Sequence, residues 1–148
     1  MRATFALSFV LLLQGCATWS RQWDLGVCRQ SSVGVYSCTV SIPKSSEVVN
    51  VGANIFFGDT KHGPVKSLRI RIENEESHAI QIQGMSPAVV LNPGETHELS
   101  VTVGQDTNGA YICAFNTSSG AVRVKFTIFG DNLDDATIKF RGLAGYGP

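Results

Sequence analysis

The stretch Val122-Arg123-Val124-Lys125-Phe126-Thr127-Ile128 alternates apolar and polar residues at every position. Side chains of a β-strand point to opposite faces in turn, so the pattern predicts a strand with one apolar face and one solvated face. The same alternation recurs before and after it, in residues 36–42, 49–57, 68–73, 80–83, 98–103 and 137–141. The chain is therefore predicted to consist of short strands that each bury one face.

Turn-forming residues separate the alternating segments. Asn92-Pro93-Gly94-Glu95 suits a type II turn, because Pro presets the second position and Gly accepts the positive φ at the third. No segment keeps a helical period over a useful length. About eight short strands at near-regular spacing predict an all-β domain, either a two-sheet antiparallel β-sandwich, which we favour, or a small barrel. We place this domain at residues 23–141 and a flexible tail at residues 142–148.

The N-terminus is typical of an export signal. A basic start at Arg2 leads into an apolar run over residues 5–13, and small residues follow it. The run is too short to span a bilayer, which takes about 20 residues. It ends at Leu13-Gln14-Gly15-Cys16, which resembles the lipobox of bacterial lipoproteins. In that family the cysteine receives the lipid and becomes the new N-terminus.

The lipobox resemblance implies a signal peptide of residues 1–15, lipidation at Cys16 and a lipid-anchored tether of residues 16–22. Ala17, and not Asp, follows the cysteine, which in that family implies the outer membrane. We therefore expect a cell-envelope protein held on the membrane by its lipid and facing the periplasm or the surface. The alternative is an ordinary secretory signal, cut after Ala17 or Ser20, which would release a soluble secreted protein.

The charges are balanced, with twelve basic and twelve acidic residues and a formal net charge of zero. Nucleic-acid binding rests on a basic footprint, and recognition of an anionic membrane surface rests on a polybasic cluster. The sequence has no long run of charge of either sign. We therefore expect no nucleic acid among its partners.

The chain has four cysteines, at positions 16, 28, 38 and 113. With Cys16 carrying lipid, three remain, which allows one disulfide and one free thiol. Export favours the disulfide. We favour Cys28–Cys38, because a hairpin brings residues ten apart together and a short loop closes easily. Cys113 would then be a buried free thiol. The alternative is Cys38–Cys113, a link between two sheets.

Residues 68–128 resemble part of the cupredoxin sandwich. The segments that carry the resemblance are 70–78, ending in His78, Leu91-Asn92-Pro93-Gly94-Glu95-Thr96, and Gly109-Ala110-Tyr111-Ile112-Cys113. The resemblance places His78 and Cys113 where that family has its first copper-binding His and its copper Cys. A blue-copper site needs a second His and a weak axial ligand such as Met. Residues 114–120 contain neither, so we expect no copper and no other cofactor.

Tyr111-Ile112-Cys113 is also similar to the Tyr-x-Cys of immunoglobulin domains. The Trp expected between the two cysteines of that family is missing, because Trp19 and Trp23 both precede Cys28. The two resemblances together imply an immunoglobulin- or cupredoxin-like sandwich.

Other patterns that carry chemistry are absent from the sequence. His62, His78 and His97 match no metal-ligand spacing, and Asp131, Asp134 and Asp135 lack the EF-hand order. There is no Gly-x-Ser-x-Gly, and no pair of carboxylates stands out for acid–base work. We therefore expect no enzyme and no metal site.

Export, an anchor and polar loops without a chemical motif predict binding of a protein partner in the envelope. The chain would serve as an accessory subunit of an assembly, or as an inhibitor or immunity-type protein. Loops of β proteins are common binding surfaces, and three loops supply the candidate residues: Asp59, His62, Asp106, Asn108, Asp131, Asp134 and Asp135. One alternative is a metal- or small-ligand-binding cupredoxin-like protein centred on His78 and Cys113. Another is a structural surface or sheath component.

Overall fold

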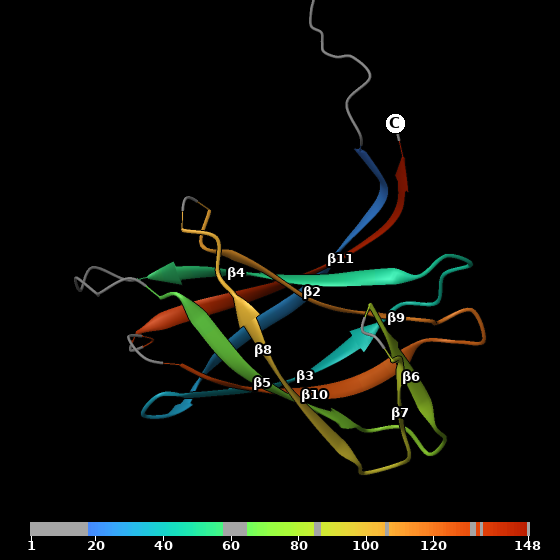
Figure 1. Ribbon diagram of the computed structural model, residues 1–148, viewed down its shortest axis with the longest axis horizontal. Helices are drawn as coiled ribbons and strands as arrows, with labels where there is room; N and C mark the ends of the chain where they lie inside the picture. Colours follow the sequence, from blue (N-terminus) through green and yellow to red (C-terminus); the bar gives the residue numbers. More distant parts are fainter. Residues whose placement is uncertain are drawn as a thin grey trace, which may run out of the picture.

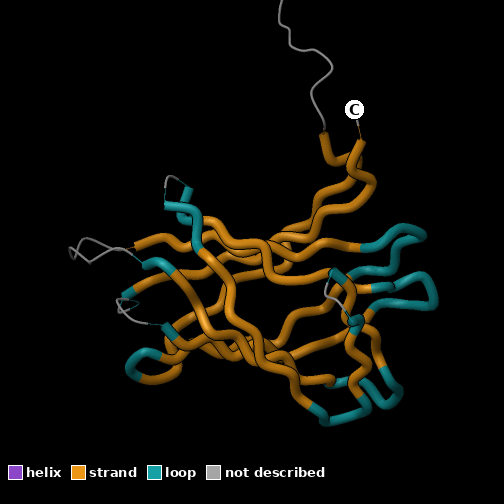
Figure 2. The backbone as a smooth tube through the Cα atoms, viewed as in Figure 1, coloured by secondary structure: helices purple, strands orange, loops and turns teal. Residues whose placement is uncertain are grey.

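The computed structural model describes residues 18–57, 65–84, 87–105, 107–130, 133 and 135–147, with side chains from residue 21 to residue 145. Strands and connecting loops make up these residues, and none of them is helical (Figure 2). The predicted all-β class is therefore confirmed for this part of the chain.

Ten strands form one antiparallel sheet. In chain order they are β2 (Thr18–Ser32), β3 (Val35–Ile42), β4 (Val49–Phe57), β5 (Ser67–Asn74), β6 (Ile80–Gln83), β7 (Val89–Leu91), β8 (Thr96–Thr102), β9 (Gly109–Phe115), β10 (Val122–Phe129) and β11 (Ala136–Gly147). Their order in the sheet is β7-β6-β9-β4-β11-β2-β3-β10-β5-β8. The sequence predicted about eight strands in two sheets. The described strands number ten instead, and hydrogen bonds join all of them in one order.

The long strand β2 explains why the sheet is continuous. Its residues 18–28 pair with β11, and its residues 29–32 pair with β3. We call β3, β10, β5 and β8 the regular half, and β11, β4, β9, β6 and β7 the bulged half. In Figure 1, β4 and β11 run along one side of the body and β3 and β10 along the other. A local pattern of alternation predicts each strand but does not reveal that one strand serves both halves.

The core lies between the two halves. Most apolar residues of the alternating segments are buried, as predicted, whereas Cys38, Phe57 and Leu99 are partly buried. β10 alternates between buried and more exposed positions along its whole length. Phe126 of β10 and Phe140 of β11 are fully buried and stack with ring centroids 4.9 Å apart. The Tyr36 hydroxyl donates to the backbone oxygen of Leu133 and accepts from the backbone N–H of Ala136 at 2.9 Å. These contacts tie the regular half to the bulged half.

The halves differ in how evenly their strands pair. The register runs without a shift between β10 and β3, between β10 and β5, and between β5 and β8. It shifts between Phe140 and Arg141 where β11 meets β2, between Val51 and Gly52 where β4 meets β9, and between Gln30 and Ser32 where β2 meets β3. Such β-bulges re-aim side chains and are common next to functional sites.

The chain ends form a two-stranded ribbon. Residues 18–21 of β2 pair with residues 144–147 of β11, beyond the last pair between β11 and β4 at Leu143 and Asn50. Figure 1 shows this ribbon leaving the body with the blue and red strands side by side. Residues 142–147, predicted as a flexible tail, thus lie in a paired strand, and β2 begins inside the predicted tether of residues 16–22. The pairing with β2 satisfies backbone hydrogen-bonding groups of this segment.

The predicted turn at residues 92–95 connects β7 to β8. Gly94 has a φ of 79°, as the third position of a type II turn requires. The backbone N–H of Glu95 donates to the oxygen of Asn92 at 2.9 Å, and the Glu95 carboxylate accepts from the backbone N–H of Asn92 at 2.8 Å.

Candidate functional site

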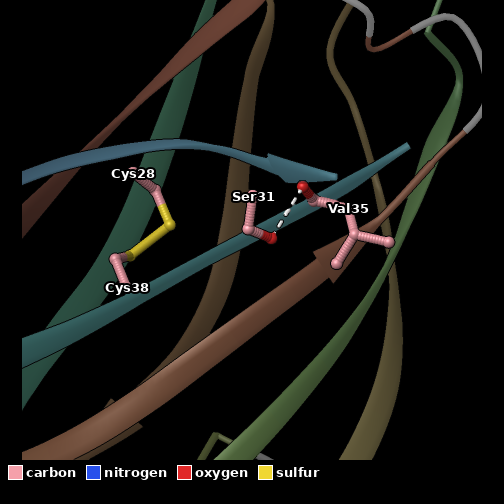
Figure 3. Close-up of a disulfide and its surroundings, with 4 residues drawn as sticks. All are labelled: Cys28, Ser31, Val35 and Cys38. Atoms are coloured by element: carbon pink, nitrogen blue, oxygen red, sulfur yellow. Dashed lines mark hydrogen bonds between the residues drawn. A yellow bond between two sulfur atoms is a disulfide. The ribbon is translucent and has the colours of Figure 1, made fainter. Parts of the chain in front are cut away.

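The predicted disulfide partners lie side by side. Cys28 of β2 and Cys38 of β3 have Cα atoms 5.2 Å apart and form a disulfide, which Figure 3 shows beside the Ser31–Val35 hydrogen bond of the same hairpin. The register explains the contact. Arg29 pairs with Ser37, so one step further from the turn places Cys28 opposite Cys38. The favoured Cys28–Cys38 pair is therefore at disulfide distance, and Cys113 is a free, buried thiol. Cys16 lies outside the described residues.

The strand ends that precede the three predicted binding loops lie at one end of the molecule (Figure 1). The backbone N–H of Ile55, near the end of β4, donates to the oxygen of Asn108 at 2.9 Å. The Gln105 amide donates to the backbone oxygen of Val65 at 2.8 Å, which ties the β8–β9 loop to the segment before β5. Figure 1 shows the ends of β4, β8 and β10 at the same side of the body. Of the seven candidate residues, the described part of the chain contains two, Asn108 and Asp135; Asp59, His62, Asp106, Asp131 and Asp134 fall outside it.

Asn108 and Asp135 have a conformational role in their turns. Their φ angles are 51° and 59°, in the left-handed region where Asn and Asp are favoured among non-glycine residues. The backbone N–H of Asp135 donates to the Gln30 side-chain oxygen at 3.3 Å. Turn geometry is therefore a sufficient reason for their residue types, and neither side chain by itself marks a binding site.

The residues of the cupredoxin resemblance occupy contrasting environments. His78 is exposed in the turn before β6, with its Nε2 3.7 Å from the Glu76 carboxylate. Cys113 is 1% exposed on β9, and burial raises the pKa of its thiol. Among the described residues, no three His, Cys, Asp or Glu side chains gather as a metal site would require. The environment of Cys113 is that of an inert structural thiol.

A hollow of about 320 Å³ lies on the outer face of β4, β9 and β11. Gly52 is at its centre, because the register places Gly52 between Tyr111 of β9 and Arg141 of β11. Two of the three register shifts adjoin this trio, one beside Gly52 and one beside Arg141. Asn50 and Asn54 flank Gly52 on the same face of β4 and also line the hollow.

The tyrosine of the hollow is held in place. Its hydroxyl donates to the Asn50 side-chain oxygen at 3.0 Å, yet the residue is 52% exposed. Partial burial raises the pKa of Tyr111, and the Cys113 thiol adds to the rise. Gly84 makes room for the ring: it has a φ of 81°, and an added Cβ there would lie 2.7 Å from the Tyr111 hydroxyl. The Asn50 hydrogen bond and the space left by Gly84 thus fix the position of this half-exposed ring.

Sequence reasoning did not identify this hollow. The signal was the polar side of residues 49–57, where Asn50, Gly52 and Asn54 alternate with apolar residues. A small residue between two amides on the solvent face of a strand leaves space there. The neighbours that enclose that space come from residues more than 50 positions away, so the sequence alone did not reveal them.

A second feature is the edge of the sheet at β8. β8 has β5 as its one strand partner in the sheet order, along all seven of its residues and without a register shift. Across from its other side lies β9, which meets β6 at Ala114 and Phe115 alone. Within the described residues, Gly104, just after β8, and Gly109, at the start of β9, form the single isolated β-bridge between these two segments. The sheet is thus nearly closed, with an open side between β8 and β9.

Over the residues that the structure describes, no helix is both long and apolar enough to cross a membrane. No protein-family model matches the chain, and no curated protein or solved structure matches it significantly.

Proposed function

We propose that the chain is an exported cell-envelope lipoprotein whose β domain binds a protein partner. The observation that best supports partner binding is the open edge of β8. An unpaired strand edge presents a row of N–H and C=O groups that a strand of another chain can satisfy. The proposed partner contributes an extended segment that pairs with β8.

The composition of β8 supports this use of its edge. Soluble proteins usually block an edge strand with proline, lysine, a bulge or short length. β8 is seven residues long, contains no Pro or Lys and pairs with β5 without a bulge. Its one charged residue is Glu98, which forms an ion pair with Arg71 at 2.8 Å. Leu99 is only partly buried, so an added strand would also cover apolar surface.

The position of the chain ends is compatible with the anchor. One residue, Ala17, separates Cys16 from the start of the paired ribbon, and that ribbon extends away from the body (Figure 1). A lipid on Cys16 would therefore hold the domain by the end of the ribbon and leave the β8 edge accessible. Two or more acyl chains suffice for stable anchoring.

We also propose that the domain works as a two-layer, immunoglobulin- or cupredoxin-like sandwich in which β2 belongs to both layers. The stacking of Phe126 on Phe140 supports this description, because these strands lie three places apart in the sheet order and still meet face to face. A packed interior between two layers is the defining feature of such folds.

The test of partner binding uses a photo-crosslinking residue at Ser100, an exposed position in the middle of β8. The captured envelope protein is identified by mass, purified and recombined with the full chain. We expect the amides of residues 96–102 to exchange more slowly in the complex, and Ser100→Lys to weaken binding at least tenfold. The matched control is Val90→Lys on the three-residue edge strand β7, which should bind normally. Equal exchange of the β8 amides, or equal binding by Ser100→Lys, would contradict the proposal.

Self-pairing of β8 is the second outcome that this edge allows. Two copies joined through β8 would form a two-fold dimer, the first unit of a structural surface component, and the dimer fraction would rise with concentration. Sedimentation of the purified chain over a hundredfold concentration range measures this. A monomer throughout excludes it, and assembly that Ser100→Lys abolishes would favour the structural role over a separate partner.

The anchor has its own test. Cys16→Ser removes the sulfur that would carry the lipid, so we expect the chain to leave the membrane fraction and its intact mass to lack acyl groups. A Cys16→Ser chain that is still processed and still membrane-bound would rule out lipidation.

A further inference from the structure

The hollow around Gly52 has the chemistry of a small-molecule site. Its volume of about 320 Å³ is at the lower end of the range for ligand pockets, roughly 300–1,000 Å³. Amide groups, a phenol and a guanidinium line it, from Asn50, Asn54, Tyr111 and Arg141, together with small residues and Leu143. These side chains offer both donors and acceptors around an exposed aromatic ring.

The backbone groups around the hollow are already hydrogen-bonded within the sheet. β4 pairs with β11 on one side and with β9 on the other over the residues that form the floor. A peptide that binds by strand addition needs free backbone groups at an edge, which this face does not offer. Recognition here must come from side chains. A ligand rich in hydroxyl groups suits them, because a hydroxyl donates and accepts at once, as an amide does, and the apolar face of a sugar ring can cover Tyr111.

The charge of the hollow favours an anionic ligand over a neutral one. Arg141 is the one cation among its lining residues, and that lining contains no carboxylate. Asp24 of β2 is the strand-register neighbour of Arg141 of β11. Its carboxylate accepts from the backbone N–H of Gly26 at 3.0 Å. Among the described residues Arg141 forms no ion pair. A guanidinium with free donors binds a carboxylate or phosphate in a two-pronged contact.

We propose that this hollow binds an acidic saccharide, with a sugar ring against Tyr111, hydroxyls on Asn50 and Asn54, and the anionic group on Arg141. Gly52 is required because any side chain at its position would fill the floor. An added Cβ there would already lie 3.3 Å from the backbone oxygen of Ala110. The site lies in the bulged half, apart from the β8 edge, so this proposal can fail while partner binding stands, and the reverse.

The experiment is calorimetric titration of the purified protein with two probes, trigalacturonic acid and neutral galactotriose. We expect the acidic probe to bind at least tenfold more tightly than the neutral one. Arg141→Gln should remove that preference, lowering affinity for trigalacturonic acid by about tenfold to a hundredfold, the worth of a charged hydrogen bond. Lys139→Gln is the matched control: it removes the same charge from the same strand but lies outside the hollow, and it should change affinity less than threefold.

Two further variants test the ring and the floor. Tyr111→Ala and Gly52→Val should each abolish binding of both probes, and near-ultraviolet circular dichroism shows whether each variant is folded. If Gly52→Val fails to fold, the test of the proposal rests on saccharide binding by Tyr111→Ala. The proposal is overturned if neither probe binds at millimolar concentration, or if folded Tyr111→Ala and Arg141→Gln bind as the parent does. It is also overturned if an unstructured peptide, titrated as a third probe, competes for Tyr111 more tightly than the saccharides.

Discussion

The regular half and the bulged half use the same strand pairing but differ in what faces the solvent. In the regular half, Arg71 and Glu98 sit opposite each other and their side chains are 2.8 Å apart, while the Arg69 guanidinium lies 4.6 Å from the ring centroid of Phe129. In the bulged half, Gly52 leaves a hollow beside Tyr111 and Arg141. The first surface pairs its guanidinium groups with neighbouring side chains, whereas the Arg141 guanidinium of the second forms no ion pair among the described residues.

The physical reason for the difference is the register. An uninterrupted antiparallel register brings side chains of neighbouring strands directly opposite each other, so that they form cross-strand pairs. A bulge inserts one residue, increases the local twist and turns the following side chains away from those partners. Interruptions beside Gly52 and Arg141 therefore coincide with the hollow, where Arg141 forms no ion pair among the described residues.

The largest expected effect tests whether the two halves share one core. Phe126→Ala, in the regular half, and Phe140→Ala, in the bulged half, each remove one ring of the stacked pair and leave a cavity. Each should lower the free energy of unfolding by about 3–5 kcal/mol. Urea unfolding followed by fluorescence and by far-ultraviolet circular dichroism measures this. Transitions that coincide for both probes confirm a shared core, and separate transitions would show that the halves unfold independently.

The second effect concerns the junction of the halves at β2 and β3. The Cys28–Cys38 disulfide closes a loop across ten sequence positions, so its removal in a Cys28→Ala, Cys38→Ala double variant should reduce stability by about 2–4 kcal/mol. The control is the parent protein with its disulfide chemically reduced, which should show a similar loss. An unchanged midpoint in both samples would mean that the hairpin is held by strand pairing alone.

The third effect belongs to the bulged half and depends on pH. Because burial raises the pKa of Cys113, the folded chain keeps a proton that the unfolded chain releases above its ordinary pKa of about 8.5. This contribution to stability is intact below that pH and declines as the pH rises, by at most about 1.4 kcal/mol per pH unit. Stability curves between pH 7.5 and 9.5 should therefore slope downward more steeply for the parent than for Cys113→Ala. Parallel curves would show that the thiol is accessible in the folded state.

The smallest effect sharpens the contrast between the two surfaces. Glu98→Gln removes the acceptor of Arg71 in the regular half and should lower stability by about 0.2–1 kcal/mol, as expected for an exposed ion pair. Arg141→Gln, in the bulged half, breaks no ion pair among the described residues and should leave stability unchanged within error. A loss in Arg141→Gln as large as that in Glu98→Gln would show that Arg141 has a structural role.

Much of the fold could be predicted from the sequence. Alternation located the strands around Phe126 and Ile138, and spacing favoured Cys28–Cys38, the pair that the structure shows, over Cys38–Cys113. The number of strands and the order in which they pair could not be predicted in this way. Alternation does not show that β2 leaves one half and enters the other, or that residues 142–147 find a partner in β2. Pairing between distant segments depends on the whole chain, whereas alternation is local.

The candidate sites show the same division between local sequence patterns and contacts of distant segments. Sequence reasoning chose polar and charged loop residues, and of these Asn108 and Asp135 have the φ angles of left-handed turns. It did not select Gly52 or Arg141, because neither belongs to a motif. Only the register places Gly52 between Tyr111 and Arg141.

By itself, then, the sequence determined which face of most strands turns to the core and made Cys28–Cys38 the favoured of two possible disulfides, because both depend on spacing along one or two neighbouring strands. The tertiary structure alone decided the order of ten strands, the open edge at β8 and the hollow at Gly52. Each of these arises where segments far apart in the chain meet, and the free energy of those meetings depends on register and packing, which no short stretch of sequence contains.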